Sequence, residues 1–159
     1  MSPLSVRHRI GRLAQSGLLA FTLFGVGCGG GSELGPNSSV APLVGDWDAD
    51  RFVVKNKANP TQSPELIRDL GAKFSLNVQP SGQYTAVLVY QGTPITEIGL
   101  LEIDGGDVVF RVSYPASGTS RSRYNLAATR LTLDGETEFD FNLDGKGDPA
   151  EAHIELKKR

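Results

Sequence analysis

The chain has 159 residues, the length of one domain with little left over. Apolar residues make up 39% and charged residues 21%, with 19 glycines and 9 prolines, which excludes collagen, coiled coils, multi-span membrane proteins and wholesale disorder. The formal net charge of −2 argues against nucleic-acid binding through a basic field, and the single cysteine excludes a disulfide framework and a multi-cysteine zinc site.

Residues 1–27 have the layout of a secretory signal peptide. Arg7, Arg9 and Arg12 form a positive region without acidic residues, and a mostly apolar stretch, 13–26, follows. A membrane-spanning helix needs roughly 20 apolar residues, so this stretch is too short to remain in the membrane. The alternative is a buried core helix, but such a helix carries its apolar side chains on one stripe, whereas this stretch is apolar all round. The segment therefore predicts export.

The only cysteine of the chain, Cys28, stands directly after this segment. With Val26 and Gly27 before it, Cys28 resembles the lipobox cysteine of bacterial lipoproteins, which is lipidated and becomes the new N-terminus. Gly25 departs from the leucine that is usual there, which leaves ordinary signal-peptidase cleavage as the alternative. The resemblance implies a lipid anchor in the cell envelope. It favours the outer over the inner membrane, because Gly29 rather than aspartate follows the cysteine.

The next segment, residues 28–40, is rich in glycine and serine, which predicts a flexible tether between membrane and domain. Loss of residues 1–27 removes three arginines and no acidic residue, so the mature chain is more acidic than its precursor. The expected organisation is therefore a signal peptide, 1–27, a lipidated tether, 28–40, and one folded domain, 41–159.

Residues 41–159 have the alternating pattern of an antiparallel β domain. In residues 73–79, for example, Phe74, Leu76 and Val78 alternate with polar side chains, as in a strand with one buried face. Turn signals recur about every 8–12 residues, which predicts an all-β barrel of about eight to nine strands. Hairpin-length connections favour up-and-down order over a Greek key. The expected strands cover residues 43–55, 73–79, 84–90, 95–103, 108–114, 121–133, 138–142 and 152–157.

Two of these segments show a slip in their apolar phase. Trp47 and Phe52 fall on opposite parities of the first strand, and a β-bulge near residues 50–51 would place both in one core. The phase also slips within residues 121–133, which are therefore either one bent strand or a short hairpin. Asp134-Gly135 is the next hairpin signal after them.

One short helix is expected between the first two strands. Ser63 is suited to cap its N-terminus, Pro64 to occupy its first position, and Glu65 to lie at its positive end. Gly71 is suited to end it. The helix would have about two turns and would cover one end of the barrel.

Several short motifs resemble those of lipocalins and bacterial lipocalin-like lipoproteins. Gly45-Asp46-Trp47 resembles the G-x-W motif of the first lipocalin strand, and residues 81–85 resemble a "dGtYt" hairpin. Glu97-Ile98-Gly99 and residues 103–107 resemble an E-x-G strand and the hairpin after it. The similarity covers about residues 42–158 and implies a lipocalin-like barrel. In such a barrel, the side chain of Trp47 packs into the core and closes one end. Gly45, which has no side chain, lets the backbone come close beneath the tryptophan.

The resemblance implies one of two functions. In the first, the barrel encloses one small hydrophobic or amphipathic ligand, and tyrosine hydroxyls line the cavity. In the alternative, side chains fill the interior, and the protein is a non-catalytic structural or interaction lipoprotein. A cavity larger than about 300 Å³ would favour the ligand. The candidate lining residues are Tyr84, Tyr90, Tyr114 and Tyr124. The candidate filling residues are Phe74, Leu76, Leu88, Phe110, Val112, Phe139 and Phe141.

Catalytic chemistry has little support in the sequence, and we expect no enzyme. His8 belongs to the signal segment, which leaves His153 as the only histidine of the mature chain, on the polar side of the last strand. Lipidation of Cys28 would leave no free thiol, so Cys/His catalysis would be unavailable. No G-x-S-x-G nucleophile elbow is present either.

Calcium is the one cofactor that a motif suggests. Residues 140–151 fit the pattern D-x-[DN]-x-[DN]-G-x₅-E, in which oxygen ligands converge around a sharp turn, here at Gly145. Against calcium stand the flanking strands, where helices are usual, and the positive charge of Lys146 in the loop. The alternative is a polar hairpin whose Asp and Gly residues form turns. The candidate ligands are Asp140, Asn142, Asp144, Asp148 and Glu151.

Overall fold

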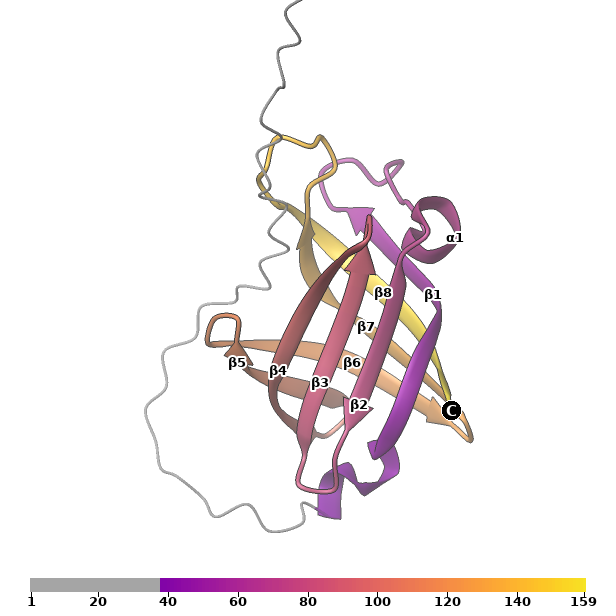
Figure 1. Ribbon diagram of the computed structural model, residues 1–159, viewed down its shortest axis with the longest axis vertical. Helices are drawn as coiled ribbons and strands as arrows, with labels where there is room; N and C mark the ends of the chain where they lie inside the picture. Colours follow the sequence, from indigo (N-terminus) through magenta and orange to yellow (C-terminus); the bar gives the residue numbers. More distant parts are fainter. Residues whose placement is uncertain (1–37) are drawn as a thin grey trace, which may run out of the picture.

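The computed structural model describes residues 38–159, which form a closed antiparallel β-barrel (Figure 1). Each strand pairs with the next along the chain and β8 pairs with β1, which confirms the predicted up-and-down order. The barrel has eight strands. They are β1 (Gly45–Asn56), β2 (Lys73–Val78), β3 (Gln83–Tyr90), β4 (Thr93–Asp104), β5 (Asp107–Tyr114), β6 (Gly118–Ala127), β7 (Arg130–Phe139) and β8 (Asp148–Lys158).

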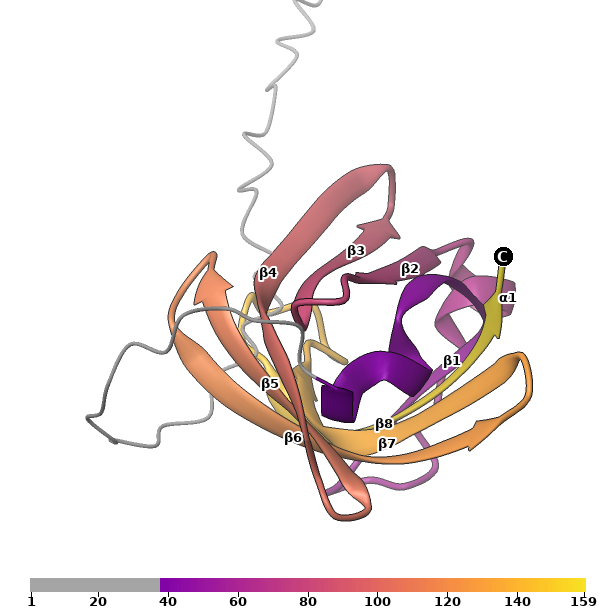
Figure 2. The ribbon, with the colours of Figure 1, turned by 90° about the horizontal axis from the view of Figure 1, so that it is seen from below.

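The described residues begin with a 3₁₀ helix, η1 (Ser38–Leu43), which lies across one end of the ring of strands (Figure 2). Val40 in this helix is fully buried, so the packed domain includes the end of the segment assigned to the tether from sequence. The expected signal peptide, 1–27, and the lipidation site Cys28 lie outside the described residues. None of the helices in residues 38–159 is long and apolar enough to cross a membrane.

The two ends of the barrel differ. The end where β1 begins carries η1 and the tight turns between β2 and β3, β4 and β5, and β6 and β7; we call it the closed end. The opposite end carries the helix α1 and the longer connections of residues 57–65, 115–117 and 140–147; we call it the open end (Figure 1). Loops of this kind at the mouth of a barrel are where ligands enter.

A β-bulge in β1 brings both halves of this strand into one core, as predicted. The pairing of β1 with β8 shifts between Ala49 and Arg51. As a result Trp47, before the shift, and Phe52 and Val54, after it, are each at most 1% exposed. A regular strand would have turned one of the two sets outward, because side chains alternate between faces.

The short helix is present, but its N-cap differs from the prediction. The helix α1 runs from Leu66 to Leu70, and Glu65 rather than Ser63 caps it, accepting hydrogen bonds from the backbone N–H groups of Ile67 (3.1 Å) and Arg68 (2.6 Å). Glu65 also accepts a hydrogen bond from the backbone of Phe52 in β1, which ties the cap to the barrel wall. A serine reaches only its own turn, whereas the longer glutamate serves both partners.

Gly71 ends α1 as predicted, with a left-handed φ of 66°. Its backbone N–H donates to the carbonyl of Ile67. Leu66 is fully buried, whereas Leu70 is 41% exposed, so α1 packs one side against the barrel near the end of β1 (Figure 1).

Residues 121–133 form a hairpin, which settles the alternative that the sequence left open. β6 and β7 meet at a turn of Ala128 and Thr129, where Ala128 has a positive φ of 53°. The hairpin predicted at Asp134-Gly135 was wrong, because both residues lie within β7. Gly135 serves a close strand approach instead, since a Cβ there would lie 2.4 Å from the hydroxyl oxygen of Ser122.

Candidate ligand-binding cavity

The half of the barrel toward the open end contains a cavity of about 200 Å³. Strands β2 to β8 contribute to its wall, and the exposed residues Pro115 and Ala116 carry the wall out to the open end. Large apolar side chains make up most of the surface. They include Leu76, Leu88, Phe110, Val112, Leu133 and Ile154.

Small inward side chains leave this space unfilled. Ala86 on β3, Ser120 and Ser122 on β6, Gly135 on β7 and Ala152 on β8 all lie on the wall. A leucine or phenylalanine at these positions would occupy the interior, as in the small barrels that are packed solid. The residues expected to fill the barrel therefore fall into two groups. Phe74, Leu76, Leu88, Phe110 and Val112 line the cavity, and Phe139 and Phe141 pack edge to face against each other.

The volume restricts the size of any ligand. The cavity lies below the volume of about 300 Å³ at which pockets for drug-sized molecules begin, so it does not meet the size that the sequence analysis set as favouring a ligand. An engineered apolar cavity of about 150 Å³ is large enough to bind benzene. The cavity therefore suits a molecule about the size of a substituted benzene.

Two ionisable groups line the cavity: Glu136, which is exposed, and Glu97, which is partly buried. The Glu97 carboxylate accepts a hydrogen bond from the hydroxyl of Tyr84 over 2.7 Å. The Tyr84 side chain itself is 1% exposed and packs edge to face against Phe110, with ring centroids 5.1 Å apart. Tyr84 is the hydrogen-bond partner of Glu97 among the described residues, and a carboxylate has room for further donors.

Gly99 makes this pair geometrically feasible. It lies opposite Tyr84 in the pairing of β3 with β4, and a Cβ at Gly99 would come within 2.9 Å of the Tyr84 ring. The missing side chain lets the ring approach β4 closely, so that its hydroxyl reaches Glu97, two residues earlier on the same face. The E-x-G motif noted in the sequence thus has a direct physical role.

Burial governs the protonation of the pair. Burial raises the pKa of the Glu97 carboxyl, and the hydrogen bond from Tyr84 offsets part of this rise. Burial, followed by the neighbouring Glu97 carboxylate, raises the pKa of Tyr84. Tyr84 therefore remains protonated and serves as a donor to Glu97 throughout the physiological pH range.

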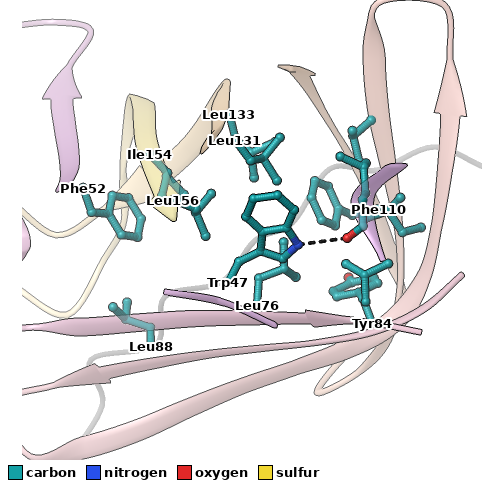
Figure 3. Packing of buried hydrophobic residues seen from close by; sticks show 14 of the residues in the cluster. Trp47, Phe52, Leu76, Tyr84, Leu88, Phe110, Leu131, Leu133, Ile154 and Leu156 are labelled. Carbon is teal, nitrogen blue, oxygen red and sulfur yellow. Dashed lines mark hydrogen bonds between the residues drawn. The ribbon is translucent and has the colours of Figure 1, made fainter. Parts of the chain in front are cut away.

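The closed end is packed around Trp47, as Figure 3 shows. Trp47 is 1% exposed, and its indole N–H donates to the backbone carbonyl of Leu43 in η1 over 2.9 Å. The Lys158 ammonium lies 5.2 Å from the centre of the indole ring. Gly45 has a φ of 132°, a backbone conformation for which glycine is suited, and the Lys158 side chain occupies the space beside it.

The four candidate tyrosines do not converge on the cavity, and none of them is part of its wall. Tyr84 lies in the core, and Tyr90 packs edge to face against Phe139 at 6.2 Å. Tyr124 is half-buried against the core, and Tyr114 is 55% exposed. Tyr84 alone reaches the site, through its hydrogen bond to Glu97.

The candidate calcium loop is held by its own hydrogen bonds. The carboxylate of Asp140 accepts from the backbone of Asp144 (3.1 Å) and Gly145 (2.8 Å), and the amide oxygen of Asn142 also accepts from Asp144. Glu151 lies on β8, opposite Lys55 of β1. Within residues 38–159, no group of three or more His, Cys, Asp or Glu side chains is placed to hold a metal ion. In this arrangement the side-chain oxygens of Asp140 and Asn142 support the turns of the loop, and calcium binding there stays a prediction.

His153 lies on the outer face of β8, away from the cavity. Its ring nitrogens contact Asp134 (2.6 Å) and Glu155 (3.2 Å), and Glu155 also pairs with Arg51. The hydrogen bond with Asp134 raises the pKa of His153, against a smaller opposing effect of burial. The group links β7, β8 and β1 across the surface, as the polar parity of His153 predicts.

Comparisons with known proteins leave the function open. No protein-family model and no curated protein matches the chain. Among solved structures, a lipocalin-like protein from Bacteroides uniformis is 15% identical with a TM-score of 0.46, covering 75% of this chain and 100% of that chain. EF1p2_mFAP2b bound to DFHBI is 14% identical with a TM-score of 0.48, covering 79% of this chain and 100% of that chain.

Proposed function

We propose that the protein is an exported, lipid-anchored barrel of the cell envelope that binds a small hydrophobic or amphipathic ligand. The observation that carries this proposal is the apolar cavity of about 200 Å³ inside the barrel, which reaches the open end. The barrel keeps its closed end packed and leaves the other half hollow, an arrangement that stability alone does not require, since empty space costs packing energy.

Toluene is a suitable probe, because it is apolar and fits the volume. We expect it to bind with a Kd of about 1 mM or tighter, corresponding to about 4 kcal/mol. In ¹H–¹⁵N NMR spectra, the shifts should concentrate on lining residues such as Ala86 and Ser122. Ala86→Leu should abolish binding, because its side chain grows into the cavity.

Val87→Leu is the matched control for this variant. Val87 is the neighbour of Ala86 on β3 and points to the opposite face of the sheet, so the same residue introduced there leaves the cavity open. Toluene should bind this control as it binds the wild type. Shifts spread over the outer surface, or equal binding to both variants, would instead favour the structural lipoprotein with no ligand site.

The anchoring part of the proposal rests on Cys28 and the leader before it. Cys28→Ala should release the protein from the membrane fraction or leave the precursor uncleaved, because the lipid attachment site is gone. Fractionation of cells, followed by immunoblotting for size and location, measures this. An unchanged membrane fraction without precursor accumulation would contradict lipidation. The proposed location is the outer membrane, with the domain in the periplasm or at the cell surface.

A further inference from the structure

We propose that the cavity binds small apolar amines, and that Glu97 holds their ammonium group by a charge-assisted hydrogen bond. This inference rests on the proposed function and specifies the chemistry of its ligand. The carboxyl group is set on a wall that is apolar over most of its surface, with Thr96, Ser120, Ser122 and Glu136 as its other polar residues, within a cavity the size of a substituted benzene. A buried carboxyl group avoids the cost of desolvating its charge either by keeping its proton or by pairing with a cation, and an ammonium ligand supplies that cation.

The charges on the wall select a cation. The ionisable residues that line the cavity are Glu97 and Glu136, and no lysine, arginine or histidine of the described chain joins them. Glu136 is exposed and pairs with Lys57, so its charge is already compensated. Within residues 38–159, the partner of Glu97 is the neutral hydroxyl of Tyr84. The interior of the cavity therefore has one acidic group without a cationic partner, and its ionised form attracts cations and repels anions.

The surroundings of Glu97 leave room for a ligand atom next to its carboxylate. On β3 its pairing partner is Ala86, whose methyl group is too short to cover the carboxylate. On the other side, the pairing of β4 with β5 begins only at Ile98 and Tyr114, so no residue of β5 lies opposite Glu97. The chain beyond β5 instead turns away through Pro115, which lines the mouth of the cavity.

The Tyr84 hydroxyl fixes the orientation of this carboxylate. It occupies one oxygen over 2.7 Å, and the tyrosine ring is held by Gly99 and Phe110. An oriented acceptor loses little freedom when a ligand binds, which strengthens the new hydrogen bond. A primary ammonium on an apolar body fits this arrangement, with its charged end at Glu97 and its body among the leucine and phenylalanine side chains. Hydrogen bonds between ionised groups are roughly twice as strong as those between neutral groups.

Benzylamine, benzyl alcohol and toluene form a matched set of probes, because they share the ring and differ in the group that faces Glu97. At about pH 7.5 the wild type should bind benzylamine about 10-fold more tightly than benzyl alcohol. In Glu97→Gln this preference should vanish, while toluene binds as in the wild type. Glutamine keeps the shape and still accepts the hydrogen bond of Tyr84, so the variant should fold. NMR titration measures all three affinities.

The variant Glu136→Gln is the control, because it removes the other carboxylate of the wall at the exposed rim. It should keep the preference for benzylamine.

The pH dependence of binding gives a second readout. Tyr84 from β3 and Glu136 from β7 are the ionisable groups that face Glu97 or share its cavity. Lowering the pH should weaken benzylamine binding as Glu97 takes up a proton, and toluene binding should stay constant.

The outcomes separate this inference from the proposed function. If toluene binds but benzylamine is no tighter than benzyl alcohol, or if Glu97→Gln keeps the preference, the amine site is wrong and the ligand-binding barrel stands. If none of the three compounds binds the wild type, both proposals fall.

Discussion

Trp47→Ala should lower the free energy of unfolding by about 3–5 kcal/mol, because it removes the largest buried side chain of the closed end. The indole is 1% exposed, and its N–H holds the carbonyl of Leu43, so η1 loses its attachment as well. A domain of this size has only about 5–15 kcal/mol in total, and the variant should be close to unfolding at room temperature. Urea denaturation followed by circular dichroism measures the loss.

Trp47→Phe is the control for this variant, since it keeps an aromatic ring in the space and loses only the hydrogen bond and some volume. Its loss should be clearly smaller. The native fluorescence gives an independent check, because Trp47 is the only tryptophan and its emission should be blue-shifted by burial. A Trp47→Ala protein that unfolds together with the wild type would show that Trp47 is not the structural floor of the barrel.

Gly99→Ala should cost about 3 kcal/mol or more, although it adds a single methyl group. The new Cβ would lie 2.1 Å from the carbonyl oxygen of Arg111 and 2.9 Å from the ring of Tyr84. The first neighbour is backbone in β5, so the pairing of β4 with β5 must open to admit it. The second neighbour holds Glu97, and the affinity for benzylamine should fall with the stability.

Gly106→Ala provides a matched control at the other end of the same pair of strands. Gly106 lies in the turn between β4 and β5, and a Cβ there meets no atom within 4 Å. This variant should change the free energy of unfolding by no more than about 0.5 kcal/mol. Equal stability of Gly99→Ala and Gly106→Ala would contradict the close contact between Tyr84 and β4.

The regular parts of the barrel could be predicted from the sequence because they obey one simple period. Alternation of apolar and polar residues marks most strands, and the phase slip between Trp47 and Phe52 even locates the bulge that the pairing shows at Ala49 and Arg51. Most connections are of hairpin length, which favours the up-and-down order that the structure shows.

Contacts between segments that are distant in the sequence decided the features that the sequence did not predict. Glycine after aspartate signals a hairpin, but Gly135 is needed where β6 approaches β7, so the turn lies at Ala128 instead. Glu65 displaced Ser63 as the helix cap because its side chain also serves β1. Both outcomes depend on contacts between distant segments, which local propensities do not take into account.

The cavity could not be predicted from the sequence either. A set of inward residues does not show whether they fill a barrel, since this depends on the summed volume of small residues such as Ala86 and Ser122. Tyrosines were expected to provide the polar contacts, yet only Tyr84 reaches the site, through Glu97. The sequence did contain a sign of the role of Glu97, because this acidic residue stands at an inward position of a strand, between Ile95 and Gly99 on the same face. Such a position is costly without a function.

A crystal structure of the protein grown with toluene is the decisive experiment, because it shows whether the barrel takes a ligand and where. We expect one toluene inside the barrel, among Ala86, Glu97 and Ser122, with the closed end around Trp47 unchanged. A barrel whose own side chains occupy this space, with toluene absent or bound only to the outer surface, would contradict a ligand-binding role.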